Sequence, residues 1–207
     1  MSSTQRPPIA VRNAGNADRP VAASVLARAF VDDPAMAFLF RDAADRPRRL
    51  ARFFGLIASI DSTPELWSLA CDADGEPVAA ALWRPPGLWK TPTSAMIANI
   101  LPLLRVFGLT LPRALSMQSV IEAHHPHPPH WYLQFAGCVP ESQGRGYGGA
   151  AIRTRLRLCD VEGQPAALET ATPSNVGLYE SLGFRVTGDY QIKGGPKFWS
   201  MWRDPVA

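Results

Sequence analysis

The first half of the chain alternates between helical and strand-like hydrophobic patterns. Apolar residues at helical spacing predict one helix with its N-cap at Asp18, which Asp32-Asp33-Pro34 ends, and a second over Arg46–Ile60. A third helical pattern, interrupted by prolines, runs from about Thr93 to Ala123. The sequence Asp72-Ala73-Asp74-Gly75 predicts a hairpin, because aspartate and glycine tolerate positive φ at low cost. The apolar runs that predict strands here are Ile9–Arg12, Leu66–Cys71 and Pro77–Arg84.

The hydrophobic pattern changes after residue 130. Nearly continuous apolar runs predict buried strands at Trp131–Val139 and Ala166–Thr170, with a helix over Gly146–Glu162 between them. Two buried strands joined by a helix predict a parallel pair with a right-handed crossover. A short helix and two further strands are expected at Asn175–Leu182, Phe184–Tyr190 and Phe198–Trp202. The sequence therefore predicts a single mixed α/β domain over residues 1–207, with residues 1–8 flexible.

Composition and charge narrow the class of protein. The 207 residues, 46% of them hydrophobic, are enough for one sizeable core. The formal net charge of +3 comes with scattered arginines, which favours an anionic cofactor over a nucleic-acid surface. Three widely spaced cysteines and a polar start at Met1–Pro8 predict a cytoplasmic protein, monomeric or homodimeric. Asn99, Pro102 and Arg105 interrupt the apolar stretch Ala95–Leu111, so no membrane span is expected.

A glycine-rich turn follows the strand predicted at Trp131–Val139. Glycines at 144, 146, 148 and 149 let the main chain approach a ligand closely, and the free N–H groups of a helix start attract phosphate. The turn lacks the Gly-Lys-Ser/Thr of a P-loop and the downstream acidic residue of a dinucleotide fold. By itself such a turn indicates an anion site or a plain tight turn.

Two segments resemble signatures of the GNAT superfamily of acetyl-CoA-dependent N-acetyltransferases. Residues 137–148, Gly-Cys-Val-Pro-Glu-Ser-Gln-Gly-Arg-Gly-Tyr-Gly, are similar to its Gln/Arg-x-x-Gly-x-Gly signature, and Leu168–Phe184 resembles its second signature. Three further segments resemble the puromycin N-acetyltransferase branch of this superfamily. They are His130-Trp131-Tyr132-Leu133, Leu168-Glu169-Thr170 and an ending of the form Gly-Pro-x-x-Trp-x-Met-x-Arg. The resemblance covers Trp131–Arg203 well and Val11–Arg84 loosely. The middle third, outside it, is where acceptor choice is expected.

This resemblance implies a fold and a cofactor site. The implied fold is a central, mostly antiparallel sheet with one splayed parallel pair and helices on both faces. Acetyl-CoA is the implied co-substrate, and no metal is expected. The backbone of Cys138 and Val139 would pair with the pantetheine arm, unless these residues form an ordinary core strand. The implied cofactor-binding residues are Cys138, Val139, Gln143, Gly144, Arg145, Gly146, Tyr147, Gly148, Gly149 and Asn175.

Tyr179 and Glu169 are the candidate catalytic residues. An amine that attacks a thioester expels a thiolate, and the Tyr179 hydroxyl can protonate it as a general acid. The alternative is a half-buried tyrosine on a short amphipathic helix. Glu169, in a strand expected to be buried, is the first candidate to take up the proton of the amine. Its alternative is a carboxylate paired with an arginine or a backbone N–H. Glu122 is a second candidate base, and a chain of water molecules is a third.

All four histidines lie within residues 124–130, together with three prolines. Such a cluster is compatible with a metal site, a rigid connection into the next strand, or a part of the acceptor pocket. The prolines remove the helical i, i+4 geometry that brings two imidazoles to one ion, which favours the rigid connection.

Together the motifs predict acetyl transfer from acetyl-CoA to a primary amine of a small molecule, by direct attack in a ternary complex. No nucleic-acid or membrane partner is expected. The alternative is a degenerate GNAT domain that binds CoA as a sensor or scaffold without turnover.

Overall fold

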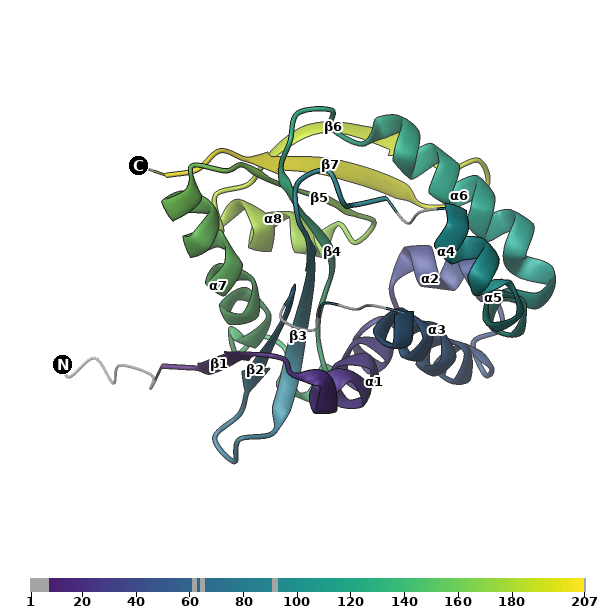
Figure 1. Ribbon diagram of the computed structural model, residues 1–207, viewed down its shortest axis with the longest axis horizontal. Helices are drawn as coiled ribbons and strands as arrows, with labels where there is room; N and C mark the ends of the chain where they lie inside the picture. The colour runs from purple at the N-terminus through teal and green to yellow at the C-terminus, as the bar shows by residue number, and fades with distance from the viewer. Residues whose placement is uncertain (1–7, 61–62, 64–65, 91–92, 207) are drawn as a thin grey trace.

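A seven-stranded sheet runs through the middle of the molecule (Figure 1). The computed structural model describes residues 8–60, 63, 66–90 and 93–206. The strand order is β1-β2-β3-β4-β5-β7-β6, and every neighbouring pair is antiparallel except β4 with β5. This confirms the predicted mixed α/β sheet with one parallel pair. The expectation of a flexible start concerned residues 1–8, of which 1–7 lie outside the described residues.

The elements follow the predicted pattern closely. The strands are β1 (Ala10–Asn13), β2 (Trp67–Cys71), β3 (Pro77–Arg84), β4 (Trp131–Cys138), β5 (Ala166–Thr170), β6 (Arg185–Gln191) and β7 (Lys197–Arg203). The α-helices are α1 (Arg19–Ala29), α2 (Pro34–Leu39), α3 (Arg46–Ile60), α4 (Thr93–Ala98), α5 (Ile100–Phe107), α6 (Leu111–His124), α7 (Tyr147–Glu162) and α8 (Ser174–Glu180). The short helix α2 has no counterpart among the predicted elements.

The start of α1 differs in one respect from the expected cap. Asp18 precedes the helix, but its side chain makes no capping hydrogen bond to it. The carboxylate instead accepts hydrogen bonds from both terminal nitrogens of Arg12, at 2.6 and 2.7 Å, and from the Gly15 N–H at 2.7 Å. Asp18 therefore ties β1 to the turn before α1, because an ionised partner forms a stronger hydrogen bond than a helix N–H.

Helices cover both faces of the sheet, as the resemblance implied. The helices α1 and α3 pack on one another beside β3 and β4, and α7 lies on the opposite face against β2 and β3 (Figure 1). Large side chains from both layers are fully buried between them. These are Leu26, Phe40, Leu50, Phe54, Trp67, Leu69, Leu82, Trp83, Val139, Ile152, Leu168 and Met201.

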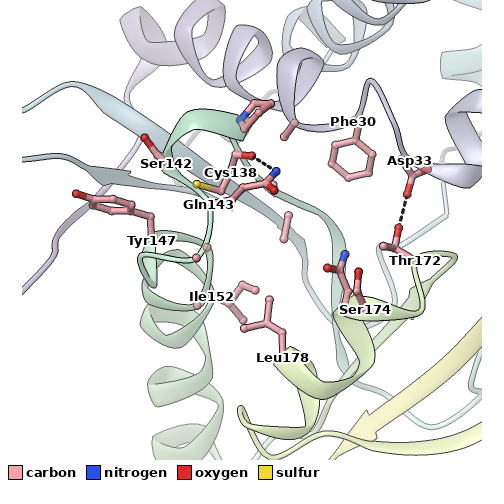
Figure 2. A pocket seen from close by; sticks show the side chains of 18 of the residues that line it. Phe30, Asp33, Cys138, Ser142, Gln143, Tyr147, Ile152, Thr172, Ser174 and Leu178 are labelled. Carbon is pink, nitrogen blue, oxygen red and sulfur yellow. Dashed lines mark hydrogen bonds between the residues drawn. The ribbon is translucent and has the colours of Figure 1, made fainter. Parts of the chain in front are cut away.

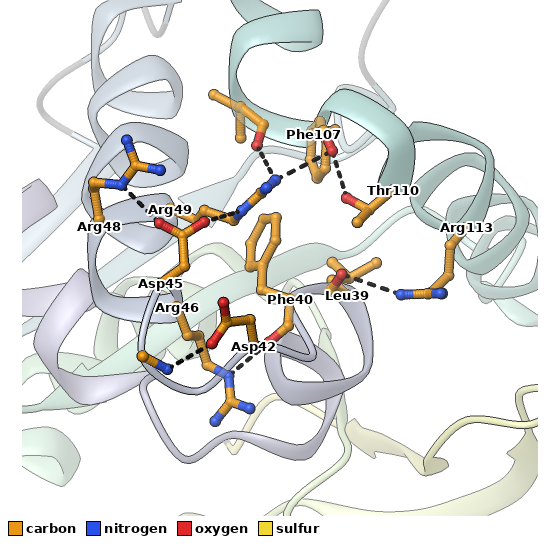
Figure 3. A network of polar contacts seen from close by, with 12 residues as sticks. Leu39, Phe40, Asp42, Asp45, Arg46, Arg48, Arg49, Phe107, Thr110 and Arg113 are labelled. Carbon is orange, nitrogen blue, oxygen red and sulfur yellow. Dashed lines mark hydrogen bonds and ion pairs between the residues drawn. The ribbon is translucent and has the colours of Figure 1, made fainter.

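The middle third of the chain is held to α2 and α3 by arginine side chains (Figure 3). Asp45 accepts a hydrogen bond from Arg49 at 2.7 Å, and Arg49 donates to the carbonyls of Val106 and Phe107 at the end of α5. Arg113 of α6 donates to the Phe38 carbonyl at 3.1 Å. These bonds satisfy carbonyl groups that helix ends leave unpaired, and they fix α5 and α6 over the sheet.

The stretch Ile100–His124 is long and apolar enough to cross a membrane by length and composition alone, and 17% of its most apolar window is buried. A single stretch of this kind is weak evidence for a span. In the structure Gly108, with a φ of +50°, lies between α5 and α6. The exposed apolar side chains of this region are Ile97, Ile100, Leu101, Leu104, Leu109 and Leu115.

Gly137 lies where α1 comes nearest to β4. A Cβ atom at this position would stand 2.6 Å from the Cβ of Ala29 and 3.2 Å from the ring of Phe30. Both neighbours belong to the packed end of α1, so the helix would have to move. We predict that Gly137→Ala lowers the free energy of unfolding by about 1–3 kcal/mol, as overpacked cores do, measured by urea denaturation.

The matched control is Gly55→Ala, in the middle of α3. A Cβ there meets nothing within 4 Å, so the change should raise the free energy of unfolding by about 0.5–1 kcal/mol through helix propensity. Equal effects of the two changes would show that the contact between α1 and β4 is not tight.

Candidate functional site

The parallel strands β4 and β5 pair over only two residues. Trp131 is opposite Ala166 and Tyr132 is opposite Ala167, after which the strands separate. On its other edge β4 stays paired with β3 as far as Cys138, opposite Ala79. Among the described residues, the edge of β4 that faces β5 therefore has no strand partner beyond Tyr132. The expected splay of the parallel pair is confirmed.

A cavity of about 690 Å³ opens on the splayed end of β4 (Figure 2). Its walls come from the end of α1, the end of β4, the glycine-rich turn and the first residues of α7 and α8. Eight of the ten predicted cofactor residues line it, namely Cys138, Gln143, Gly144, Gly146, Tyr147, Gly148, Gly149 and Asn175. The other two lie elsewhere. Arg145 is in the turn itself and is exposed, and Val139 is buried, with its N–H donating to the Val78 carbonyl at 2.9 Å.

The glycine-rich turn presents main-chain donors to this cavity. Gly144 and Gly146 have φ values of +71° and +92°, a conformation that residues with a Cβ adopt at a cost. Gly146 is the N-cap of α7, and the first helical hydrogen bond runs from the Ala150 N–H to the Gly146 carbonyl. The N–H groups of residues 147–149 consequently have no acceptor within the helix. A turn of this kind fits a diphosphate.

A second cavity of about 190 Å³ lies on the other side of β4, beneath α5 and α6. Its walls are mostly apolar. Two carboxylates line it, Glu169 of β5 and Asp33. The helices of the middle third contribute Phe107, Ala114, Met117, Gln118 and Ile121. The aromatic side chains from other elements are Phe30, Phe53, Trp89, Tyr132, Phe135, Tyr179 and Phe198.

The two cavities meet at one place. Five residues line both of them, and they come from the end of α1, the loop after it, β4 and α8. These are Phe30, Asp33, Ala136, Asn175 and Tyr179. A group held in the larger cavity and a group held in the smaller one can therefore come into contact beside Tyr179.

Tyr179 is buried in α8, with 7% of its surface exposed. Burial raises the pKa of its hydroxyl, and the nearby negative charge of Asp33 raises this pKa further. The hydroxyl is therefore protonated at neutral pH and can act only as a proton donor. Asn175 lies one turn earlier, inside α8, whose N-cap is Pro173. Asn175 therefore does not cap this helix.

Asp33 is a site residue that the sequence analysis assigned only to the end of a helix. Its side chain accepts hydrogen bonds from the N–H groups of Ala35 and Met36, at 2.9 and 3.0 Å, and so begins α2. The Thr172 hydroxyl donates to it at 3.1 Å across the cavity (Figure 2). Burial raises the pKa of this carboxyl. An aspartate before a proline is a recognisable helix start, and that signal could have found it.

Glu169 is buried, with 3% of its side chain exposed. The expected alternative partners, an arginine or a backbone N–H, do not reach it: neither carboxylate oxygen has a hydrogen-bond partner among the described residues. Nδ1 of His125 lies 3.4 Å from Oε1 of Glu169. The buried Tyr132 hydroxyl is also close, since burial and then the charge of Glu169 raise its pKa. Glu122 instead pairs with Lys90 at 2.5 Å, and this contact lowers the pKa of the Glu122 carboxyl. Glu122 is consequently the weaker candidate base.

The four histidines point into different surroundings. His124 stacks on Tyr190 with ring centroids 4.1 Å apart, and His125 stacks on Trp89 at 3.6 Å. His130 is buried, which lowers the pKa of its ring, and its Nδ1 lies 2.7 Å from a backbone carbonyl. His127 is exposed. Within residues 8–60, 63, 66–90 and 93–206, no group of three or more histidine, cysteine, aspartate or glutamate side chains could hold a metal ion.

Comparison with known proteins gives a consistent picture. No family model matches the chain. An uncharacterized N-acetyltransferase of Schizosaccharomyces pombe is 39% identical over 54 residues, which are 26% of this chain and 22% of that protein. The chain thus matches about a fifth of the length of this curated relative. A structure described as histone acetyltransferase HPA2 and related acetyltransferase, from Corynebacterium glutamicum, is 25% identical, with a TM-score of 0.71 over 96% of this chain and 97% of that one.

More distant structures share the fold. The polyamine N-acetyltransferase of Drosophila melanogaster, which forms N-acetylagmatine, is 15% identical, with a TM-score of 0.62 over 95% of this chain and 100% of that one. Other matches act on proteins, such as the NatC complex bound to Gag peptide and CoA, at 13% identity and a TM-score of 0.53, over 96% of this chain and 99% of that one. These neighbours show the GNAT fold and support a GNAT-type N-acetyltransferase. The puromycin N-acetyltransferase branch is not among the relatives described.

The thiol of Cys138 lines the larger cavity, and burial followed by the charge of Glu141 raises its pKa to about 11 from a usual value of 9.0. Because the thiolate is the reactive form, alkylation of Cys138 at pH 8 should be about 100-fold slower in the folded protein than in the unfolded chain. The rate should rise about tenfold for each pH unit up to pH 10. Mass spectrometry of the Cys138 peptide after iodoacetamide treatment measures this.

The urea-unfolded protein supplies the reference rate, and Cys138→Ala identifies the labelled peptide. Labelling of folded protein at pH 7 as fast as that of the unfolded chain would show a reactive thiolate, and would make Cys138 a candidate nucleophile.

Proposed function

We propose that this protein transfers an acetyl group from acetyl-CoA to a primary amine of a small molecule, by direct attack in a ternary complex. The observation that carries the proposal is the meeting of two cavities beside Tyr179, one lined by the glycine-rich turn and the other by aromatic side chains. A donor and an acceptor bound side by side need no covalent enzyme intermediate. The raised pKa of Cys138 also argues against one.

Acetyl-CoA fits the larger cavity by the chemistry of its walls. The N–H groups at the start of α7 are donors for a diphosphate, and the unpaired edge of β4 offers backbone groups to the amides of the pantetheine arm, as in strand addition. Cys138 lies at the end of this edge, where its carbonyl accepts a hydrogen bond from the Gln143 side chain at 3.0 Å, and the Val139 N–H is bonded to Val78. We therefore assign the arm to β4 residues up to Cys138, and the diphosphate to Gln143 and residues 144–149.

The smaller cavity favours a small acceptor with an apolar part. About 190 Å³ beneath α5 and α6 holds a compact molecule, and its aromatic walls stabilise an apolar body through burial. The carboxylate of Glu169 attracts the ammonium group of such an acceptor. The acceptors to test are aminonucleosides, aminoglycosides, polyamines, arylalkylamines and amino acids, with thiol release as the readout.

The proposed chemistry divides between two side chains. Glu169 takes up a proton from the acceptor, which leaves the neutral amine that attacks the thioester carbonyl. The Tyr179 hydroxyl donates a hydrogen bond to the departing sulfur. Because burial holds the pKa of Tyr179 above its usual value of 10.0, and thiols ionise near 8.5, complete transfer of the tyrosine proton is uphill. The contribution of Tyr179 should therefore be at the lower end of general-acid effects.

Gly146→Asp tests the cofactor site. The change places a negative charge beside the proposed diphosphate, at a residue with a φ of +92°, and should weaken acetyl-CoA binding by at least about tenfold, or about 1.4 kcal/mol. Isothermal titration calorimetry measures the dissociation constant. The matched control is Gly75→Asp, in the turn between β2 and β3, with a similar φ of +87°. An unchanged dissociation constant for Gly146→Asp, with the fold intact, would refute the assignment of the turn.

Tyr179→Phe tests the chemical step, because it keeps the ring and removes the hydroxyl. Single-turnover measurements should show the rate falling about 100-fold, at the lower end of general acid catalysis, with acetyl-CoA affinity unchanged. The ratio of variant to parent rates should be constant from pH 6 to 9, because the hydroxyl remains protonated throughout this range.

Tyr147→Phe is the matched control at saturating acetyl-CoA, since Tyr147 lines the larger cavity but not the place where the two cavities meet. A parent-like single-turnover rate for Tyr179→Phe would reduce Tyr179 to a packing residue. Acetyl-CoA binding without thiol release for any acceptor would favour the sensor or scaffold alternative.

A further inference from the structure

His125 is packed at the base of the smaller cavity. It follows the last turn of α6 as its C-cap, and only 1% of its side chain is exposed. Trp89 stacks on one face of the ring at 3.6 Å between centroids, and Tyr132 meets it edge-on at 4.8 Å. These ring contacts fix the plane of the imidazole. Packing, and not a hydrogen bond, therefore sets the direction in which its two nitrogens point.

The Nδ1 atom of His125 lies 3.4 Å from Oε1 of Glu169. Both side chains are almost completely buried, and none of their four polar atoms has a hydrogen-bond partner among the described residues, so the 3.4 Å contact brings the two groups together without forming a hydrogen bond. Burying one charge without a partner is costly, and burying a polar group without a hydrogen bond is also costly. A carboxylate and an imidazole that share one proton avoid the isolated charge. This pairing is therefore the arrangement that the burial favours.

The two residues face the cavity differently. Glu169 lines it together with Tyr179 and Asn175, whereas His125 is not among the lining residues and stands behind Glu169. A proton taken up by Glu169 from a molecule in the cavity can thus pass to His125 without that molecule touching the imidazole.

We infer that His125 is a positioning residue for Glu169, and that the two form one proton-accepting unit for the acceptor amine. The inference rests on the proposed acetyl transfer. Before the step Glu169 is a carboxylate and His125 a neutral imidazole without a proton on Nδ1, so the pair carries one negative charge, which the acceptor ammonium balances. In the proton step an N–H bond of the acceptor ammonium breaks and an O–H bond to Glu169 forms, and the pair reaches the uncharged state with one proton that burial favours. The proton is then shared with Nδ1 of His125, and the electron pair left on the amine nitrogen attacks the thioester. Nothing is oxidised or reduced.

Other ionisable groups surround the unit from each neighbouring element. Tyr132 of β4, His130 before β4 and Tyr190 of β6 lie on the sheet side. On the helix side the charge of Glu122 in α6 is paired with Lys90. The Arg84 side chain of β3 donates a hydrogen bond to Gln134 at 2.7 Å. Burial, and then the charge of Glu169, raise the pKa of the Tyr132 and Tyr190 hydroxyls. Neither hydroxyl therefore carries a competing charge at neutral pH.

Variants at position 125 separate the proton role from the packing role. His125→Phe keeps a ring on Trp89 but has no nitrogen, and His125→Asn keeps an amide near Nδ1 but takes up no proton. Both should lower kcat by about tenfold, and Glu169→Gln should lower it by about 100-fold or more, with acetyl-CoA affinity unchanged. The matched control is His127→Asn, at the exposed histidine of the same loop. A parent-like kcat for His125→Phe would overturn the inference and leave a packing role.

The pH profile gives a second readout. Two groups that can share a proton bind the first proton at least as tightly as either group does alone. Replacing His125 by an asparagine removes one of the two groups. The rise of kcat/KM at the acidic end should therefore move to lower pH in His125→Asn. A profile that coincides with that of the parent would contradict a shared proton.

A measurement without turnover keeps this inference separate from the proposed function. Long-range ¹H–¹⁵N NMR of the imidazole rings should show a different Nδ1 chemical shift for His125 in Glu169→Gln than in the parent, because the carboxylate that lies 3.4 Å from Nδ1 is replaced by an uncharged amide. Identical spectra would refute the pair even in an active enzyme. A parent that acetylates no amine but shows the expected difference would refute the proposed function and retain the pair.

Discussion

The separation of β4 from β5 after two residue pairs is the constraint on which the site depends. A continuous parallel pair would satisfy the backbone groups of β4 on both edges and would leave no space between the strands. Because the strands diverge, one edge of β4 faces a cavity on the side of α7 and α8. A second cavity opens beneath α5 and α6. The end of α1 approaches Gly137 of β4 closely, and Phe30, just after this helix, lines both cavities.

The two cavities rely on different kinds of contact. The larger one presents main-chain N–H groups at the start of α7, which recognise an anion whatever the neighbouring side chains are. The smaller one is made of side chains, and the helices that close it are fixed by Arg49 and Arg113 through carbonyl groups at helix ends. The proposed cofactor site is thereby built on the sheet and the start of α7, whereas the proposed acceptor site also depends on how α5 and α6 are held.

Two acidic side chains, Asp33 and Glu169, line the smaller cavity, and they are stabilised differently. Asp33 is held by two backbone N–H groups and the Thr172 hydroxyl, which offset the cost of its burial and fix the loop before α8. Glu169 has no such donors among the described residues and faces His125. The carboxylate with full hydrogen bonds is suited to a structural role, and the one without them is suited to exchanging a proton.

The sequence by itself determined the features that depend on near neighbours. The periodicity over Arg46–Ile60 and Ala166–Thr170 gave the bounds of α3 and β5, and the glycine-rich turn before α7 was recognisable because its conformation and its free N–H groups are local properties. Tertiary structure alone decided what distant segments do together. The Thr172 bond to Asp33 spans 139 residues, and Glu169 meets His125 although the histidine-rich segment suggested a rigid connection. Such contacts are set by how strands diverge and helices pack, and hydrophobic periodicity carries no information about which buried polar groups will face each other.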